Sequence, residues 1–257
     1  MKFLQSLSAQ VSLFTQGAIL ALGVVFILLD AITESLNPVI DLAWVTVLVC
    51  GLPLFINSVQ SIWERLEIHA NFLIVVAMVA LISIGDYHTA AYVGLIVQAG
   101  FFLEQLITGE SHYTVDDDML PTMPAQLVAM RQGINNYSSV IVVAVLLLSM
   151  GSFALTQDFK HTVTLLLVLC PCSLELILVA LMMGSLVDDA SPVSELSKGT
   201  KQSHLGLLIV SIVFHVAIIC VGVLGLIAPV TAVALHGLAR LGLVYNLKVL
   251  NGSLCVA

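Results

Sequence analysis

The sequence predicts an all-α, polytopic membrane protein with about eight transmembrane helices. Of its 257 residues, 60% are hydrophobic and only 9% are charged, whereas an ordinary soluble domain carries about 25% charged residues. Apolar runs of roughly 20 residues, the length that crosses a bilayer as a helix, recur along the chain. Because so few polar side chains could not cover the chain in water, we expect the lipid bilayer to surround it.

Eight apolar stretches are long enough to be these spans, and together they predict a single transmembrane domain, 1–257. They lie near 11–32, 42–63, 69–86, 89–107, 137–155, 162–187, 205–227 and 229–250. Only Gly85-Asp86-Tyr87-His88 separates the third from the fourth, and Ala228-Pro229 joins the seventh to the eighth. We expect each of these two pairs to form a tight antiparallel hairpin.

The basic residues orient the spans. If both termini are cytoplasmic, the cytoplasmic side holds Lys2, Arg65, Arg131, Lys198, Lys201 and Lys248. The opposite side holds only Lys160, and Arg240 falls within the last span. This bias follows the positive-inside rule. The two longer loops, 108–136 and 188–204, are then cytoplasmic, and both are shorter than the roughly 50 residues of a soluble domain. We therefore expect an integral protein of a bacterial inner (plasma) membrane.

Charge and cysteine content exclude two classes of protein. The formal net charge of −8 disfavours nucleic acid as a partner. Most of the five cysteines lie inside apolar runs, which disfavours a disulfide framework of the secreted kind. The first apolar run is too long for a signal peptide and lacks a cleavage site, so it is interpreted as a retained anchor.

The sixth predicted span contains Cys170-Pro171-Cys172. A proline inside a helix removes a hydrogen bond and clashes with the carbonyl four residues back. A break at Pro171 would let both thiols face one cavity, and irregular backbone at membrane depth is tolerated where it lines a site. Thiolates are soft ligands for zinc, copper and iron-group metals. The alternative is a pair of buried thiols beside a simple proline kink.

Three further residues extend this candidate metal site. Glu175 lies three residues after Cys172, near the centre of the span, where an acid costs about 2.5–3.5 kcal/mol on insertion scales and indicates function by default. His215 and His236 lie inside the last two spans, and each could supply an imidazole to a metal between helices. Alternatively, Glu175 pairs with another helix, and each histidine is a hydrogen-bonded packing residue.

These residues resemble the heavy-metal-transporting P-type ATPases of the Cys-Pro-Cys class. The segment Leu169-Cys170-Pro171-Cys172-Ser173-Leu174 is similar to the metal-site helix of that family. The stretch from His69 to Glu104 resembles its central hairpin, and that from Gly225 to Lys248 resembles its last two helices. Residues 124–133 look like the first strand of its actuator domain. The similarity covers most of the family's membrane region in the same order.

The chain departs from the family where ATP is used. It contains no Asp-Lys-Thr-Gly-Thr and no Gly-Asp-Gly-x-Asn-Asp motif. Thr108-Gly109-Glu110-Ser111 spells the family's dephosphorylation motif, but it precedes the actuator-like segment instead of following it, and we interpret it as a coincidence or a relic. Glu175 stands where the family usually has a small residue, so the identity of the metal cannot be carried over.

Two functions of different classes follow. The first is a motor-less metal pump that binds or translocates a divalent transition metal, such as zinc, iron or cobalt, at Cys170, Cys172, Glu175, His215 and His236. It would use no nucleotide, would not be an enzyme, and could work with a separate soluble or membrane partner subunit. The second is a structural or regulatory subunit of a larger membrane complex, derived from a degenerate pump.

Overall fold

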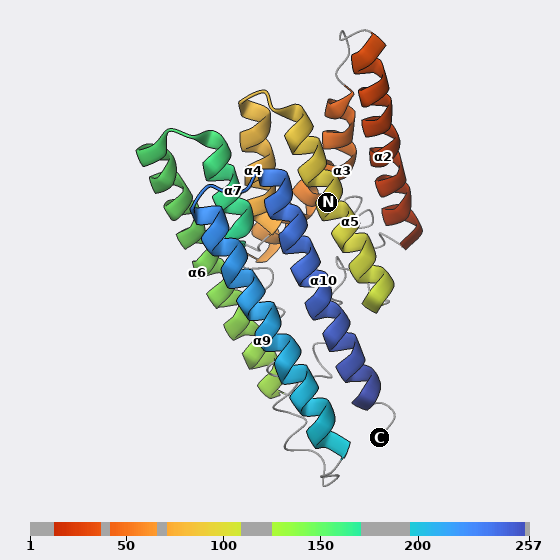
Figure 1. Ribbon diagram of the computed structural model, residues 1–257, viewed down its shortest axis with the longest axis vertical. Helices are drawn as coiled ribbons and strands as arrows, with labels where there is room; N and C mark the ends of the chain where they lie inside the picture. Colours follow the sequence, from red (N-terminus) through yellow and green to blue (C-terminus); the bar gives the residue numbers. More distant parts are fainter. Residues whose placement is uncertain (1–12, 37–41, 66–70, 109–124, 171–195, 255–257) are drawn as a thin grey trace.

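The structure is a computed structural model, and it describes residues 13–36, 42–65, 71–108, 125–170 and 196–254. These residues form eight helices and no strand, so the predicted all-α class is confirmed for this part of the chain (Figure 1). The helices are α2 (Leu13–Leu36), α3 (Ala43–Arg65), α4 (Asn71–Ser83), α5 (Tyr87–Thr108), α6 (Ala125–Thr156), α7 (Phe159–Val168), α9 (Leu196–Val223) and α10 (Pro229–Leu254).

Four helices contain segments long and apolar enough to cross a membrane, namely Phe14–Thr33, Ala43–Trp63, Tyr87–Ile107 and Tyr137–Thr156. The other four contain shorter apolar segments among the residues searched. Large apolar side chains cover the outside of the bundle; Leu155, for example, is 88% exposed and Phe14 85% exposed. Such a surface would aggregate in water but suits lipid. The chain is therefore a membrane protein in contact with lipid, and the part of it that the structure describes is all-helical.

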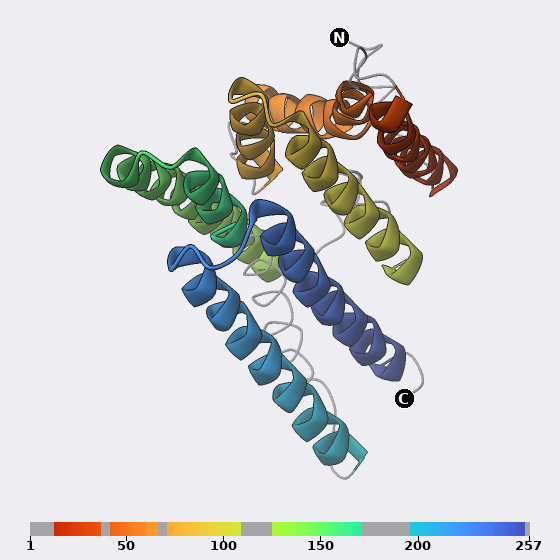
Figure 2. The ribbon, with the colours of Figure 1, turned by 45° about the horizontal axis from the view of Figure 1, so that its top comes forward.

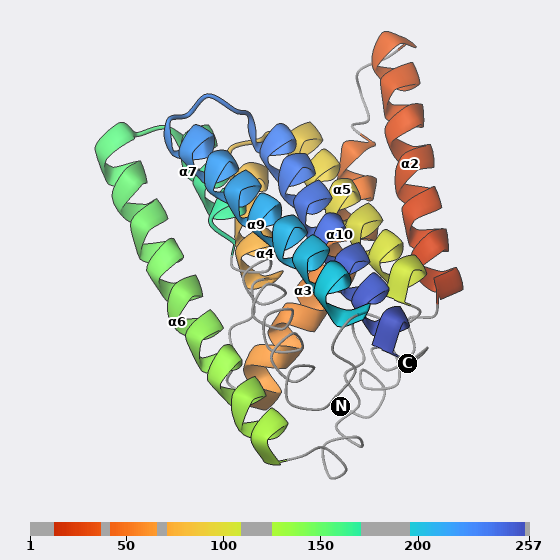
Figure 3. The ribbon, with the colours of Figure 1, turned by 60° about the horizontal axis from the view of Figure 1, so that its bottom comes forward.

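Helices α5 and α10 lie at the centre of the described bundle. Helix α5 packs against α2, α3 and α4 on one side and against α10 on the other, and α10 in turn packs against α7 and α9. Figure 2 shows α10 running between α5 and α9. Helix α6 lies to one side, where its main contact is with α7 (Figure 3). A central cluster of buried apolar side chains joins α3, α4, α5, α6 and α7 and includes Val233 of α10.

Both predicted hairpins are confirmed. Helix α4 ends at Ser83 and α5 begins at Tyr87, while α9 ends at Val223 and α10 begins at Pro229. Each turn contains a glycine with a positive φ, 78° at Gly85 and 70° at Gly225, a conformation that side chains with a Cβ disfavour. Pro229 stands at the first position of α10, where its missing N–H costs nothing. These turns and the α6–α7 turn lie at one end of the bundle, which we call the turn end (Figure 1).

Helix α6 corrects one expectation. Residues 125–133, which resemble the first strand of an actuator domain, belong to α6, and the helix continues without a break to Thr156. The stretch is rich in Ala, Gln, Leu and Met, which favour helix, and no strand is present in the described residues to pair with it. The strand expectation is therefore wrong. Part of the loop expected over 108–136 is likewise helical.

Candidate metal site

Helices α9 and α10 bring two histidine rings into an edge-on contact. The two helices run antiparallel from the tight turn between Val223 and Pro229, and they lie side by side over their length (Figures 1 and 3). His215 of α9 and His236 of α10 are both buried, with 8% and 6% of their surface exposed. Their ring centres are 5.4 Å apart and the ring planes are inclined at 81°. The hairpin therefore brings together the two imidazoles that the sequence predicts as ligands.

A backbone hydrogen bond selects the tautomer of His215. Its Nδ1 lies 3.0 Å from the carbonyl oxygen of Ser211, one turn earlier on α9. A carbonyl oxygen only accepts hydrogen bonds, so Nδ1 must carry the proton, and in a neutral imidazole the lone pair is then on Nε2. Metal-binding histidines commonly have this arrangement, in which the second ring nitrogen donates to a backbone carbonyl.

The spacing of the rings fits a shared ion. Two imidazoles bonded to one tetrahedral metal at about 2.0–2.1 Å have their ring centres roughly 5 Å apart. The separation of 5.4 Å between His215 and His236 is close to this value. The pair is thus compatible with half of a four-coordinate site.

Cys170 lies two residues after the end of α7 and is buried, with 5% of its surface exposed. The regular helix ends at Val168, with Leu169 as the cap whose N–H bonds to the carbonyl of Leu165. The residue before a proline disfavours the helical conformation, so the helix ends just ahead of Pro171. This agrees with the expectation that the proline interrupts the sixth span. Cys170 itself belongs to the central apolar cluster.

The end of α7 packs tightly against α9. A Cβ added to Gly222 would lie 2.9 Å from Cγ2 of Val168, so only glycine permits this approach. His215 lies seven residues before Gly222 and therefore on nearly the same face of α9, about 10.5 Å along the helix axis. Because α7 runs antiparallel to α9 here, the axis of α7 at Val168 points toward the level of His215.

Cys172 and Glu175 lie outside the described residues, so their predicted position beside the histidines stays a prediction. Within the described ranges, no group of three or more His, Cys, Asp or Glu side chains is placed to hold a metal ion. The candidate site in this part of the chain therefore consists of the His215–His236 pair, and Cys170 does not join it as a third ligand.

His236 also lines a small cavity between α4, α5 and α10, with a volume of about 40 Å³. Gly100 of α5 and Gly237 of α10 create the space, since a Cβ on either would touch nothing within 4 Å. Such a volume exceeds the roughly 10–15 Å³ that one water molecule needs. Glu104 and Arg240 also line the cavity.

Comparison with known proteins identifies no relative of this chain. No protein-family model, curated protein or solved structure matches this chain. The functional argument therefore rests on the residues and their geometry.

The sequence did not lead us to expect the ion pair between Arg240 and Glu104 at this cavity. Arg240 Nη2 lies 3.0 Å from one carboxylate oxygen of Glu104 and 3.3 Å from the other, and its guanidinium lies 5.4 Å from the centre of the Phe101 ring. A signal was present, because a basic and an acidic residue both fell inside predicted spans, where such groups usually pair.

Proposed function

We propose that the chain is a motor-less membrane module that binds a divalent transition metal within the bilayer. Cys170, Cys172, His215 and His236 supply the ligands, and Glu175 supplies a carboxylate at the same site. Zinc, iron and cobalt fit this mixed set of sulfur, nitrogen and oxygen donors. The observation that carries the proposal is the buried His215–His236 pair, whose rings are 5.4 Å apart.

The covalent chain limits where the second thiol can lie. Two residues extend a chain by at most about 7 Å, so Cys172 stays within that distance of the buried Cys170. From the approach of α7 to α9 at Val168 and Gly222, we expect this segment to lie near the histidines. The two cysteines thus supply the missing half of the ligand set.

Electrostatics favour a neutral complex at membrane depth. A dication bound by two thiolates and two neutral imidazoles has no net charge, and net charge is what the bilayer interior penalises. Tetrahedral coordination by two cysteines and two histidines is a common zinc arrangement. Glu175 is then either a ligand in place of one thiolate or a neighbouring acid that stays protonated, and both arrangements keep the site neutral.

The proposed architecture has eight spans with both termini in the cytoplasm. Four spans correspond to the long apolar helices, and the other four pass through α4, α7, α9 and α10. This arrangement resembles the membrane region of the heavy-metal P-type ATPases without their ATP-hydrolysing domains. Transport is then passive, coupled to another gradient, or driven by a separate chain, and the purified chain alone should not hydrolyse ATP.

The test is metal binding by the purified chain in detergent or nanodiscs. Wild-type protein should hold about one zinc or cobalt ion tightly, and the Cys170→Ser/Cys172→Ser double variant should lose that ion. Cys220→Ser is the matched control, because Cys220 is an exposed cysteine on α9 and its loss should change nothing. A double variant that binds metal as tightly as wild type would refute the proposal.

Purification from native membranes separates this proposal from the structural-subunit alternative. Metal bound to the isolated chain supports the metal-binding module. A stable stoichiometric partner, with no metal bound to either protein, would instead identify the chain as a structural or regulatory subunit.

A further inference from the structure

Three buried glutamines lie on α2 and α5, two helices that contain candidate membrane spans. Gln16 and Gln98 are 0% exposed and Gln105 is 7% exposed. In the part of the chain that the structure describes, neither amide atom of Gln16 or of Gln98 forms a hydrogen bond, and the amide oxygen of Gln105 forms none either. We call Gln16, Gln98 and Gln105 the glutamine cluster.

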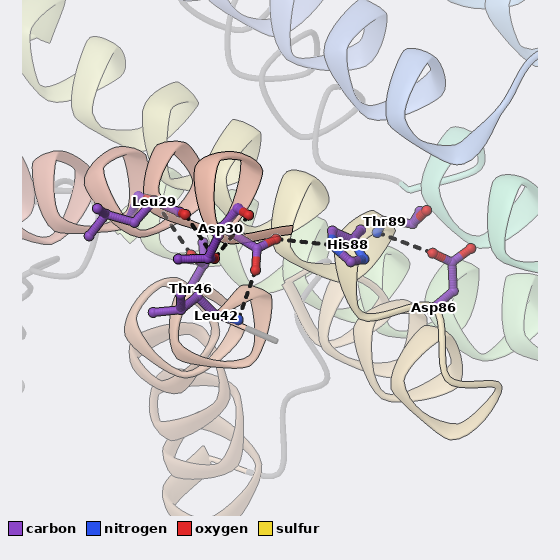
Figure 4. A network of polar contacts seen from close by, with 9 residues as sticks. Leu29, Asp30, Leu42, Thr46, Asp86, His88 and Thr89 are labelled. Carbon is purple, nitrogen blue, oxygen red and sulfur yellow. Dashed lines mark hydrogen bonds and ion pairs between the residues drawn. The ribbon is translucent and has the colours of Figure 1, made fainter. Parts of the chain in front are cut away.

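Contacts between α2 and α5 fix how the two helices lie against each other. At the turn end, Oδ2 of Asp30 on α2 lies 2.9 Å from Nε2 of His88, in the first turn of α5 (Figure 4). Toward the opposite end, a Cβ added to Gly17 of α2 would lie 3.2 Å from Cε2 of Phe102 on α5. The two helices are therefore antiparallel, and Gln16 lies close to the level of Phe102.

This register places Gln16 between the two glutamines of α5. An α-helix rises 1.5 Å per residue, so Gln16 is roughly 4 Å along the helix axes from Gln105 and roughly 7 Å from Gln98. The two glutamines of α5 are seven residues apart, which is almost two turns, and they lie on the same face of the helix. The three side chains thus follow one line along the contact between α2 and α5.

The glutamines of both helices also share a direction, toward α3. A Cβ added to Gly23 of α2 would lie 2.7 Å from Sγ of Cys50 on α3, and one added to Gly94 of α5 would lie 3.5 Å from Cβ of the same cysteine. Gln16 precedes Gly23 by seven residues, and Gln98 follows Gly94 by four. Each glutamine therefore continues a helix face that points toward α3.

The amides of the cluster need partners that the lipid cannot supply. Gln98 lies near the middle of the candidate span Tyr87–Ile107, and the hydrocarbon of a bilayer forms no hydrogen bonds. Each amide has two N–H donors and one carbonyl acceptor, so a suitable ligand both accepts and donates hydrogen bonds. The amides are uncharged, and a bound ion would bring a net charge to membrane depth, where charge is costly.

We propose that the glutamine cluster is a water-binding site, in which ordered water molecules bridge Gln16 on α2 to Gln98 and Gln105 on α5. Water is neutral and both donates and accepts, and a buried water molecule typically forms about three hydrogen bonds to polar groups that otherwise lack partners. Gln105 lies near the end of α5 that is opposite the turn end, so we expect the water to enter from that side. The site is independent of the proposed metal site.

Apolar replacements test whether water bridges the amides. Gln16→Met and Gln98→Met keep the length of the side chain and remove its amide. If water bridges the two residues, each single variant leaves the opposite amide without its partner, whereas replacing both amides is far less harmful. We expect Tm to fall in each single variant by about 2–4 °C, the shift that a modest loss of stability causes in a chain of this size. Tm should largely recover in the Gln16→Met/Gln98→Met double variant.

Hydroxyl-radical footprinting in nanodiscs tests for the water itself, because the radicals form from water and label the side chains beside it. Phe102 contacts Gly17 and lies about one turn from both glutamines of α5. Its labelling should be severalfold lower in the double variant than in wild type. Labelling of Phe72, which packs against the central apolar cluster, is the control and should be equal in the two proteins. The proposal is overturned if the single variants raise Tm, or if Phe102 is labelled equally in both proteins.

Discussion

Arg240 of α10 forms a buried ion pair with Glu104 of α5, across the contact that joins the two central helices. The side chains are 13% and 11% exposed, and the guanidinium also lies over the ring of Phe101. A charge in the apolar interior is costly unless an opposite charge compensates it. The pair therefore holds α5 and α10 at the spacing that frames the cavity beside His236.

Removing one partner of this pair should be more harmful than removing both. Glu104→Met or Arg240→Met alone leaves an uncompensated buried charge, which typically costs about 3–5 kcal/mol. The double variant Glu104→Met/Arg240→Met should recover most of that loss. Thermal unfolding of the four proteins in one detergent gives the coupling energy. Single losses that simply add in the double variant would show that the pair does not act as a unit.

Gly222 should be irreplaceable because α7 approaches α9 so closely there. Gly222→Ala puts a methyl group 2.9 Å from Cγ2 of Val168, and such overpacking typically costs about 1–3 kcal/mol. Adding Val168→Ala should restore much of the stability. Gly206→Ala is the control in the same helix, since a Cβ there meets nothing within 4 Å. It should be neutral or stabilising by up to about 1 kcal/mol.

Asp158 should be needed to start α7. Its Oδ1 accepts hydrogen bonds from the backbone N–H groups of Lys160 and His161, at 2.9 and 3.2 Å. Asp158→Ala should cost about 0.5–2 kcal/mol, whereas Asp158→Asn, which retains a capping oxygen, should cost much less. Unfolding monitored by circular dichroism tests this difference. Equal losses for the two variants would mean that the cap does not stabilise α7.

We expect the stabilisation that the ionised carboxylate of Asp86 provides to be lost in acid. Burial alone would raise the pKa of its carboxyl, but the bonds from Thr89 and the positive charge of Lys160 outweigh this effect and lower the pKa below 3.8. A carboxyl whose pKa is lowered on folding stabilises the folded protein at pH values above its unfolded-state pKa. This contribution disappears as the pH falls through its folded-state pKa.

The size of this contribution is limited by solvent, because the Lys160 side chain is 66% exposed; surface ion pairs contribute up to about 1 kcal/mol. Lys160→Met should therefore lower stability near neutral pH by no more than this amount, and the difference from wild type should vanish as the pH falls through the folded-state pKa of Asp86. Thermal unfolding of Lys160→Met and wild type, near neutral pH and in acid, measures this difference. A difference that persists undiminished in acid would contradict the assigned cause.

The elements that the sequence predicted well are those with strong local signals. The hairpins around Gly85 and at Pro229 were predictable because glycine with a positive φ and proline at a helix start act within a few residues. The proximity of His215 and His236 follows from the second hairpin. The end of α7 before Pro171 follows from the steric effect of proline on its neighbour.

The elements that were missed depend on distant or weak signals. Glu104 and Arg240 are 136 residues apart, and no local pattern relates them. The early start of α6 at Ala125 lies outside any apolar run, so hydropathy could not reveal it. The contacts of Asp86 and His88 required the relative positions of four helices, although both had been predicted to lie in a turn.

The most direct test of the central claim is X-ray absorption of the purified chain loaded with one equivalent of zinc. We expect a first shell of about two sulfurs near 2.3 Å and two nitrogens near 2.0–2.1 Å. His215→Ala/His236→Ala should remove the nitrogen component and weaken binding, whereas His161→Ala, on α7 beside Gly225, should preserve the full spectrum. A shell without sulfur, or one unchanged by the loss of both histidines, would contradict the proposed site.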